Sequence, residues 1–387
     1  MSWLLLLLTL LVVMTFSSSH GFLLPTTTPP PSMAFGSIIT TTTSTSSSTT
    51  TSSLYCQLLG MSCRQPTDFS FSFQGFCKRG GETDIHSDGW GLAFYQNGGV
   101  RQFHDDQPAA ESPLADFLVQ YPIRTVNMMA HIRYATHGPV NLANVHPFAR
   151  EWAGVQWVFA HNGHVPLFID DNQDDDNDNN ELPILGDNKQ NQTQVYHPVG
   201  TTDSEAAFCA ILNALRHKYD RKLPSLPALY QTLHELATEI VDYAPDDTIL
   251  NFLMACGPHV LWVYSWPGRR PGSDVWNGLH YTVREYPFTK CHLCDLDYTV
   301  DFGTVTTQQD RVAVVATRPL TDDEEWIELE PGELILLDEG LPHAHTQQLA
   351  RLEQMGHGLV NSTTTGLLQE DLRRYEFQPE FHVGGGI

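Results

Sequence analysis

The chain has 387 residues, of which 45 are Asp or Glu and 21 are Lys or Arg, so its formal net charge at pH 7 is −24. Such a charge repels phosphate backbones and anionic headgroups, which argues against nucleic acid and anionic lipid surfaces as partners. The apolar fraction of 41%, with 10% aromatic residues, makes a substantial hydrophobic core available.

The chain begins with a segment that is typical of a signal peptide. Residues 3–16 are almost entirely Leu, Val, Met, Thr and Phe, a run too short to span a bilayer comfortably. Ser19 and Gly21 place small residues just before Phe22, as a cleavage site requires, although no Lys or Arg precedes the run. We therefore predict a signal peptide at residues 1–21, entry into the secretory pathway, and no stable membrane span after processing.

A leader at residues 22–55 follows, rich in Ser, Thr and Pro, and its first 33 positions, 22–54, carry no charge. Such a composition buries too little apolar surface to offset the entropy of ordering, so we expect disorder. Two interpretations stay open. The leader resembles the bipartite plastid presequences of algae with complex plastids, although it lacks their usual arginines. The alternative is a secreted protein with a mucin-like stalk.

The remainder predicts one large domain at residues 56–340 and a C-terminal tail at 341–387 with one helix at 365–375. Two stretches have helical periodicity, 204–219 and 229–243. Strands and helices without regular alternation favour an α+β fold. Short apolar runs bounded by Gly, Pro, Asn or Asp indicate strands at 90–95, 126–131, 156–160, 250–255, 260–264, 312–317 and 333–337.

Two features outside the main pattern are conspicuous. An acidic, Asn-rich insertion at residues 170–187 is predicted to be a solvated surface loop. It is not a calcium loop, because Asn179 and Leu185 stand where such a loop needs Gly and Glu. Cys291 and Cys294 form a CxxC pair that has no second pair with which to bind zinc. A chance pair near a strand is favoured there over a redox role.

Three strings carry side chains suited to chemistry. Residues 131–138 read HIRYATHG, and Arg133 within them can hold a carboxylate by two parallel hydrogen bonds. Asn162-Gly163 is typical of a tight hairpin turn, and it can also aim donors at one oxygen. Thr202 and Glu205 have the spacing of a capping box at a helix start. The histidines of this region match no standard metal-ligand spacing, so we predict no metal site.

With Cys56 upstream, these strings resemble class II glutamine amidotransferases, whose nucleophile is an N-terminal cysteine. The resemblance implies the four-layer αββα sandwich of N-terminal-nucleophile hydrolases over about residues 56–337. It also implies that Cys56 is the nucleophile and that its own α-amine is the general base, so activity requires cleavage between Tyr55 and Cys56. The Asn162 Nδ2 and the Gly163 N–H would stabilise the oxyanion.

The same resemblance assigns the substrate contacts. Arg133 would clamp the α-carboxylate of glutamine, and Asp203 would bind its α-ammonium. Thr136 and His137 would shape the pocket. None of these roles requires a cofactor or a metal.

The expected reaction is hydrolysis of glutamine or a related γ-glutamyl amide through a thioester on Cys56, releasing ammonia or an amine and glutamate. No acceptor domain is recognisable, which is similar to the stand-alone branch of the family; a separate ammonia-accepting subunit is compatible with the sequence. The alternative function is a catalytically silent protein that binds glutamine or a γ-glutamyl compound while the leader blocks Cys56.

Overall fold

The computed structural model describes residues 56–136, 138–169, 194–268 and 277–343. The predictions for the signal peptide, the leader, the acidic insertion, His137 and the tail helix lie outside these residues. Within them, no helix combines the length and apolar character needed to cross a membrane.

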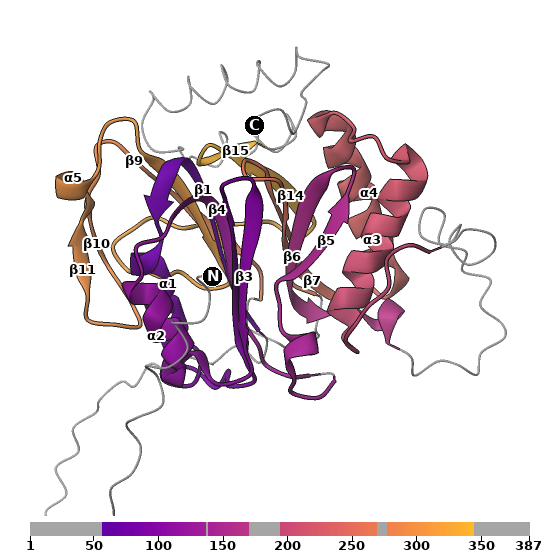
Figure 1. Ribbon diagram of the computed structural model, residues 1–387, viewed down its shortest axis with the longest axis horizontal. Coiled ribbons are helices and arrows are strands. Elements are labelled where there is room, and N and C mark those ends of the chain that lie inside the picture. Colours follow the sequence, from indigo (N-terminus) through magenta and orange to yellow (C-terminus); the bar gives the residue numbers. More distant parts are fainter. Residues whose placement is uncertain (1–55, 137, 170–193, 269–276, 344–387) are drawn as a thin grey trace, which may run out of the picture. The chain divides into compact units, whose positions relative to one another are not determined.

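Two antiparallel sheets form the centre of the fold (Figure 1). The first has seven strands in the order β13 (Ile327–Glu328), β9 (His280–Glu285), β12 (Arg311–Ala316), β1 (Gln57–Asp68), β4 (Arg124–Ile132), β2 (Trp90–Gln96), β3 (Gly99–Asp105). The second has six strands in the order β15 (Leu341–His343), β14 (Glu333–Asp338), β8 (Leu261–Trp266), β7 (Ile249–Cys256), β6 (Val155–His164), β5 (Phe148–Trp152). A small ribbon pairs β10 (Lys290–His292) with β11 (Thr299–Asp301).

Helices cover the outer face of each sheet. The seven-stranded sheet is covered by α1 (Ser70–Lys78) and α2 (Pro113–Gln120), and the six-stranded sheet by α3 (Asp203–Tyr219) and α4 (Leu226–Tyr243). The remaining helices are short: η1 (Ala109–Glu111), η2 (Leu142–Asn144), η3 (Pro166–Phe168) and α5 (Phe302–Val305). The predicted αββα sandwich is therefore confirmed.

Alternation along the strands explains why both faces of each sheet are covered. In β7, Phe252 and Met254 pack toward α3 and α4, while Leu253 and Ala255 pack toward the seven-stranded sheet. Because successive strand residues point to opposite faces, a strand that is apolar at every position must be buried on both sides. All eight residues of β7 are buried.

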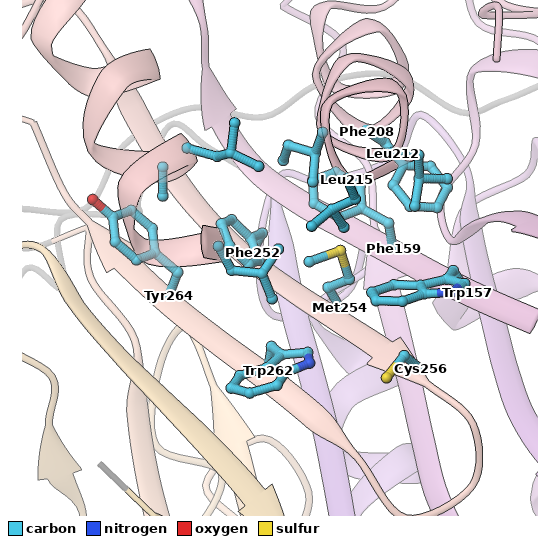
Figure 2. Close-up of a cluster of buried hydrophobic side chains, with 14 of the residues drawn as sticks. Trp157, Phe159, Phe208, Leu212, Leu215, Phe252, Met254, Cys256, Trp262 and Tyr264 are labelled. Atoms are coloured by element: carbon cyan, nitrogen blue, oxygen red, sulfur yellow. The ribbon is translucent and has the colours of Figure 1, made fainter. Parts of the chain in front are cut away.

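The outer core of the six-stranded sheet is strongly aromatic (Figure 2). Phe208 of α3 stacks on Phe159 of β6, with ring centroids 5.0 Å apart. Leu212 and Leu215 follow on the same face of α3, as helical spacing requires. This packing fixes α3 against the sheet, so the position of the helix's first residue is set by the core.

In the described part of the chain, all seven predicted strands and the helices predicted at 204–219 and 229–243 are present, with boundaries shifted by at most a few residues. The six-stranded sheet continues through β15 to His343, three residues beyond the predicted domain boundary. All seven cysteines are free thiols.

Candidate active site

Cys56 lies immediately before β1, where the neighbouring strand β4 ends. The two strands are antiparallel with Gln57 opposite Ile132, so the next step along β1 reaches the residues that follow β4. The Tyr134 N–H donates to the Cys56 Sγ at 3.3 Å, and the thiol donates to the Tyr134 carbonyl at 3.4 Å. Strand register therefore brings the cysteine to a segment 78 positions away.

The surroundings of the Cys56 thiol keep it protonated. Burial raises its pKa to about 11, and the nearby Asp203 acts in the same direction. The hydrogen bond with the Tyr134 backbone and the charge of Arg133 oppose this effect without overcoming it. Because the thiolate is the nucleophilic form, the thiol needs a base beside it to react near neutral pH.

Arg133 follows β4 directly, and only 3% of its surface is exposed. Its Nη1 donates to the Pro139 carbonyl at 3.1 Å and its Nη2 to the Gly138 carbonyl at 3.3 Å. The Arg133 N–H donates to the carbonyl of Gly89 at 2.8 Å, a residue whose φ of +104° suits glycine. Burial lowers the pKa of the guanidinium, which stays charged at neutral pH. The site thus holds a fixed cation suited to a carboxylate.

Asp203 is the first residue of α3. As predicted, Thr202 caps the helix, its Oγ1 accepting from the Glu205 N–H at 3.2 Å. The Glu205 carboxylate does not complete a capping box but accepts from the backbone of Val199 and Gly200. Asp203 Oδ2 accepts from the Val165 N–H at 2.7 Å, and Oδ1 accepts from the Ser204 N–H at 2.9 Å. These bonds hold the carboxylate in one orientation at the helix N-terminus.

Asn162 and Gly163 lie in the last residues of β6, so the hairpin-turn interpretation is wrong. They pair with Asn251 and Leu250 of β7. The strand continues to His164, so the chain does not turn at these two residues. Gly163 has no room for a side chain, because a Cβ there would lie 1.9 Å from the Ile249 carbonyl oxygen. The Asn162 Oδ1 is buried without a hydrogen-bond partner among the described residues. No hydrogen bond from the described residues to this oxygen therefore fixes the orientation of the Asn162 side-chain amide.

One pocket brings these residues together. The space inside it, including its open mouth, is about 310 Å³. Asn162 is buried beside Gly163 without lining the pocket, and His137 lies outside the described residues. The lining residues are Cys56, His131, Arg133, Tyr134, Thr136, His146, His161, Gly163, Thr202, Asp203 and Ser204.

The structure adds residues to the site that the sequence did not predict as members. The rings of His131 and His146 are in contact, with centroids 4.1 Å apart and planes tilted by 39°, and burial lowers the pKa of each well below its ordinary value. His161 Nδ1 lies 2.8 Å from the Ser204 Oγ. His131 and His161 stand in the strings already singled out, but only the packing of the two sheets, which brings β4 of one against β6 of the other, shows that they line one pocket.

These histidines do not assemble a metal site. In the part of the chain that the structure describes, no three His, Cys, Asp or Glu side chains are grouped closely enough to hold an ion. The low pKa of the buried rings instead indicates neutral imidazoles in the pocket wall at pH 7.

Comparisons with known proteins agree with this geometry. Residues 55–357 match the family model of class-II glutamine amidotransferases. A Haemophilus influenzae protein named "Putative glutamine amidotransferase" is 38% identical over 285 residues, 74% of this chain and 85% of that one. "Putative glutamine amidotransferase YafJ" of Escherichia coli is 38% identical over 278 residues, 72% of this chain and 95% of that one.

A solved structure is also similar. The crystal structure of a "predicted glutamine amidotransferase" from Pseudomonas aeruginosa is 35% identical, with a TM-score of 0.52. The match covers 75% of this chain and all of that one.

Proposed function

Because this chain belongs to the class-II glutamine amidotransferases, we propose that it hydrolyses the side-chain amide of glutamine, or a related γ-glutamyl amide, through a thioester on Cys56. One observation carries the proposal. A single small pocket joins a thiol, a buried cation, a strand-end glycine and a carboxylate at a helix start: Cys56, Arg133, Gly163 and Asp203.

The chemistry begins with removal of the residues before Cys56, which frees its α-amine. An α-amine titrates near pH 8, so a substantial fraction is neutral at physiological pH and can take the thiol proton. The Sγ then attacks the amide carbon, and the Asn162 amide and the Gly163 N–H stabilise the oxyanion. Collapse expels ammonia or an amine, which carries away the proton from the α-ammonium.

Water completes the cycle. The α-amine, neutral again, accepts a proton from the attacking water, and the oxyanion forms a second time at the same donors. The C–S bond breaks, the thiolate regains a proton from the amine, and the free carboxylate leaves as glutamate.

The substrate is held by its two charged ends. The buried guanidinium of Arg133 suits the α-carboxylate, and the carboxylate of Asp203 suits the α-ammonium. Thr136, exposed at the pocket rim, and His137 belong to the same proposed substrate wall. A cation and a carboxylate in the lining of one pocket support an α-amino acid or a small γ-glutamyl compound as substrate.

We also propose that the amide-hydrolysing chemistry resides in the αββα unit that residues 56–343 form where they are described. Ammonia would be released or passed to a separate subunit. Removal of the leader after entry into the secretory pathway would coincide with activation, whether the mature protein is secreted or reaches a plastid.

The silent-binder alternative is favoured by one observation: Tyr55 precedes Cys56 in the encoded chain. N-terminal mass spectrometry of the mature protein decides between the two functions, together with glutamate release from glutamine. The enzyme proposal expects Cys56 as the first residue, turnover of glutamine, and no glutamate release by Cys56→Ala. Full turnover by Cys56→Ala would refute it.

A further inference from the structure

Asn144 is a fully buried polar residue outside the pocket lining, and it bridges two loops that are far apart in sequence. Its side chain is 0% exposed. The Nδ2 donates to the Pro139 carbonyl at 3.0 Å and to the Thr201 Oγ1 at 3.3 Å, and the Oδ1 accepts from the Thr201 N–H at 2.8 Å. Every polar atom of this side chain is thus satisfied by the two loops, as a buried amide requires.

The first loop leads back to Arg133. The Pro139 carbonyl that accepts from Asn144 also accepts from Arg133 Nη1 at 3.1 Å. One oxygen therefore holds both side chains, and moving Asn144 moves the acceptor that orients the guanidinium.

The second loop leads to Asp203. Thr201, which both donates to and accepts from Asn144, is followed by the helix cap Thr202 and then by Asp203. The guanidinium of Arg133 is therefore connected to Asp203 through hydrogen bonds to the Pro139 carbonyl, from there to Asn144 and on to Thr201. The backbone from Thr201 through Thr202 completes the connection to Asp203.

Two glycines make this interlocking of loops sterically feasible. A Cβ on Gly200 would lie 2.2 Å from the Asn144 Oδ1, and a Cβ on Gly138 would lie 2.8 Å from its Nδ2. Any larger residue at either position would push the loops apart. Glycine at both positions is therefore what allows the two loops to approach the Asn144 side chain this closely.

We propose that Asn144 is a positioning residue that sets the spacing between the cation of Arg133 and the carboxylate of Asp203, and so makes the pocket selective for a ligand carrying both α-charges. This inference rests on the proposed substrate contacts of those two residues. The α-carboxylate and α-ammonium sit on one carbon, so both are held only if cation and anion are at the right separation. A prearranged pair binds without the entropic penalty of ordering two loops.

The test measures binding, so that it does not depend on turnover. Chains starting at residue 56 and carrying Cys56→Ala are titrated calorimetrically with glutamine and with glutaramate, which lacks the α-amino group. Asn144→Ala should raise the Kd of glutamine about tenfold, equivalent to about 1.4 kcal/mol. It should raise that of glutaramate by no more than about threefold, because a ligand with one charge depends on the orientation of Arg133 but not on its spacing from Asp203.

Milder variants keep the test valid if Asn144→Ala does not fold. Thr201→Val removes one acceptor of the Asn144 Nδ2 and should raise the glutamine Kd by a smaller factor, whereas Thr201→Ser should restore it. The matched control is Asn141→Ala, which removes a hydrogen bond within the same loop, from the Asn144 N–H to the Asn141 Oδ1, and leaves the bridge intact. It should not change the preference for glutamine.

The outcomes separate this inference from the proposed function. Equal losses for glutamine and glutaramate, or the same effect from Asn141→Ala, would overturn the positioning role. The predicted pattern in a protein that binds glutamine but never hydrolyses it would support the positioning role and refute the hydrolysis. A chain that binds neither compound would refute both.

Discussion

The most decisive prediction concerns the backbone nitrogen of Cys56, which is a free α-amine only when no residue precedes it. A chain that retains one extra residue, with Tyr55 still attached, has an amide nitrogen in place of the proposed base. The pKa of the half-buried Cys56 thiol is about 11, so at pH 7.5 well under about 1% of molecules carry a thiolate. A free α-amine, by contrast, is about one-third neutral at that pH.

The extended chain should therefore lose the contribution of general-base catalysis, about 10²–10⁴-fold in kcat/KM. The assay is glutamate release by two chains that differ only in the presence of Tyr55, with intact masses checked before and after. For the chain that starts at Cys56, kcat/KM should rise with pH toward about 8, because the amine is a base only when it is deprotonated. The matched control carries a protease site whose cleavage exposes Cys56 and should restore activity. An extended chain of verified mass that turns over at the rate of the trimmed one would refute the mechanism.

Three further predictions follow from individual side chains. Asp203→Asn should raise the KM for glutamine by about 10–100-fold with little change in kcat, because a charged hydrogen-bond partner is lost in ground and transition states alike; an unchanged KM would exclude the role. Gly163→Ala should destabilise the fold in a urea titration as well as abolish activity, because its Cβ would lie 1.9 Å from the Ile249 oxygen; a fully stable variant would contradict this geometry. Burial lowers the pKa of His343 to about 4, so the folded state holds this ring neutral and its stability should fall by up to about 3 kcal/mol as pH drops from 6.5 to 4. Thermal unfolding of His343→Gln should show a shallower decline over that range, and an unchanged slope would argue against the assignment.

The sequence predicts the fold best where one physical signal dominates. Strands buried on both faces, such as β7, are continuous apolar runs with Gly or Pro at their ends and are therefore recognisable. The edge strand β3 is half-exposed along most of its length, so its hydrophobic pattern is weak and it was not predicted. The helix α1 has no side-chain cap and buries Phe and Cys among small residues, a pattern that also fits a strand.

The candidate site divides in the same way. Arg133, Gly163 and Asp203 lie at or near the ends of predicted elements. Once the two sheets are packed face to face, these ends meet in one pocket. Tyr134 contacts the Cys56 thiol through its backbone N–H and carbonyl. Because every residue type has these groups, the sequence pattern cannot predict such a contact. Asn144 matters through a bridge to a residue 57 positions away. Its type and neighbours suggest only a turn, and the tertiary contact alone gives it a role.

The two functions considered for this chain are compatible as successive states of one molecule. Arg133 donates to the backbone carbonyls of Gly138 and Pro139, and Asp203 accepts from the Val165 and Ser204 N–H groups and the Ser204 hydroxyl. None of these hydrogen bonds involves the α-amine of Cys56. The binding half of the site therefore does not require cleavage, whereas the chemical half does.

A chain that retains Tyr55 should accordingly bind glutamine with a Kd within a few-fold of the trimmed chain carrying Cys56→Ala, while its kcat/KM for glutamate release stays about 10²–10⁴-fold below that of the active trimmed chain. Calorimetry on both chains tests this expectation directly. Failure of the extended chain to bind would mean that Tyr55 obstructs the pocket, and the precursor would then be blocked in recognition as well as in catalysis. Equal binding would instead place the whole effect of cleavage on the proton that the thiol must lose.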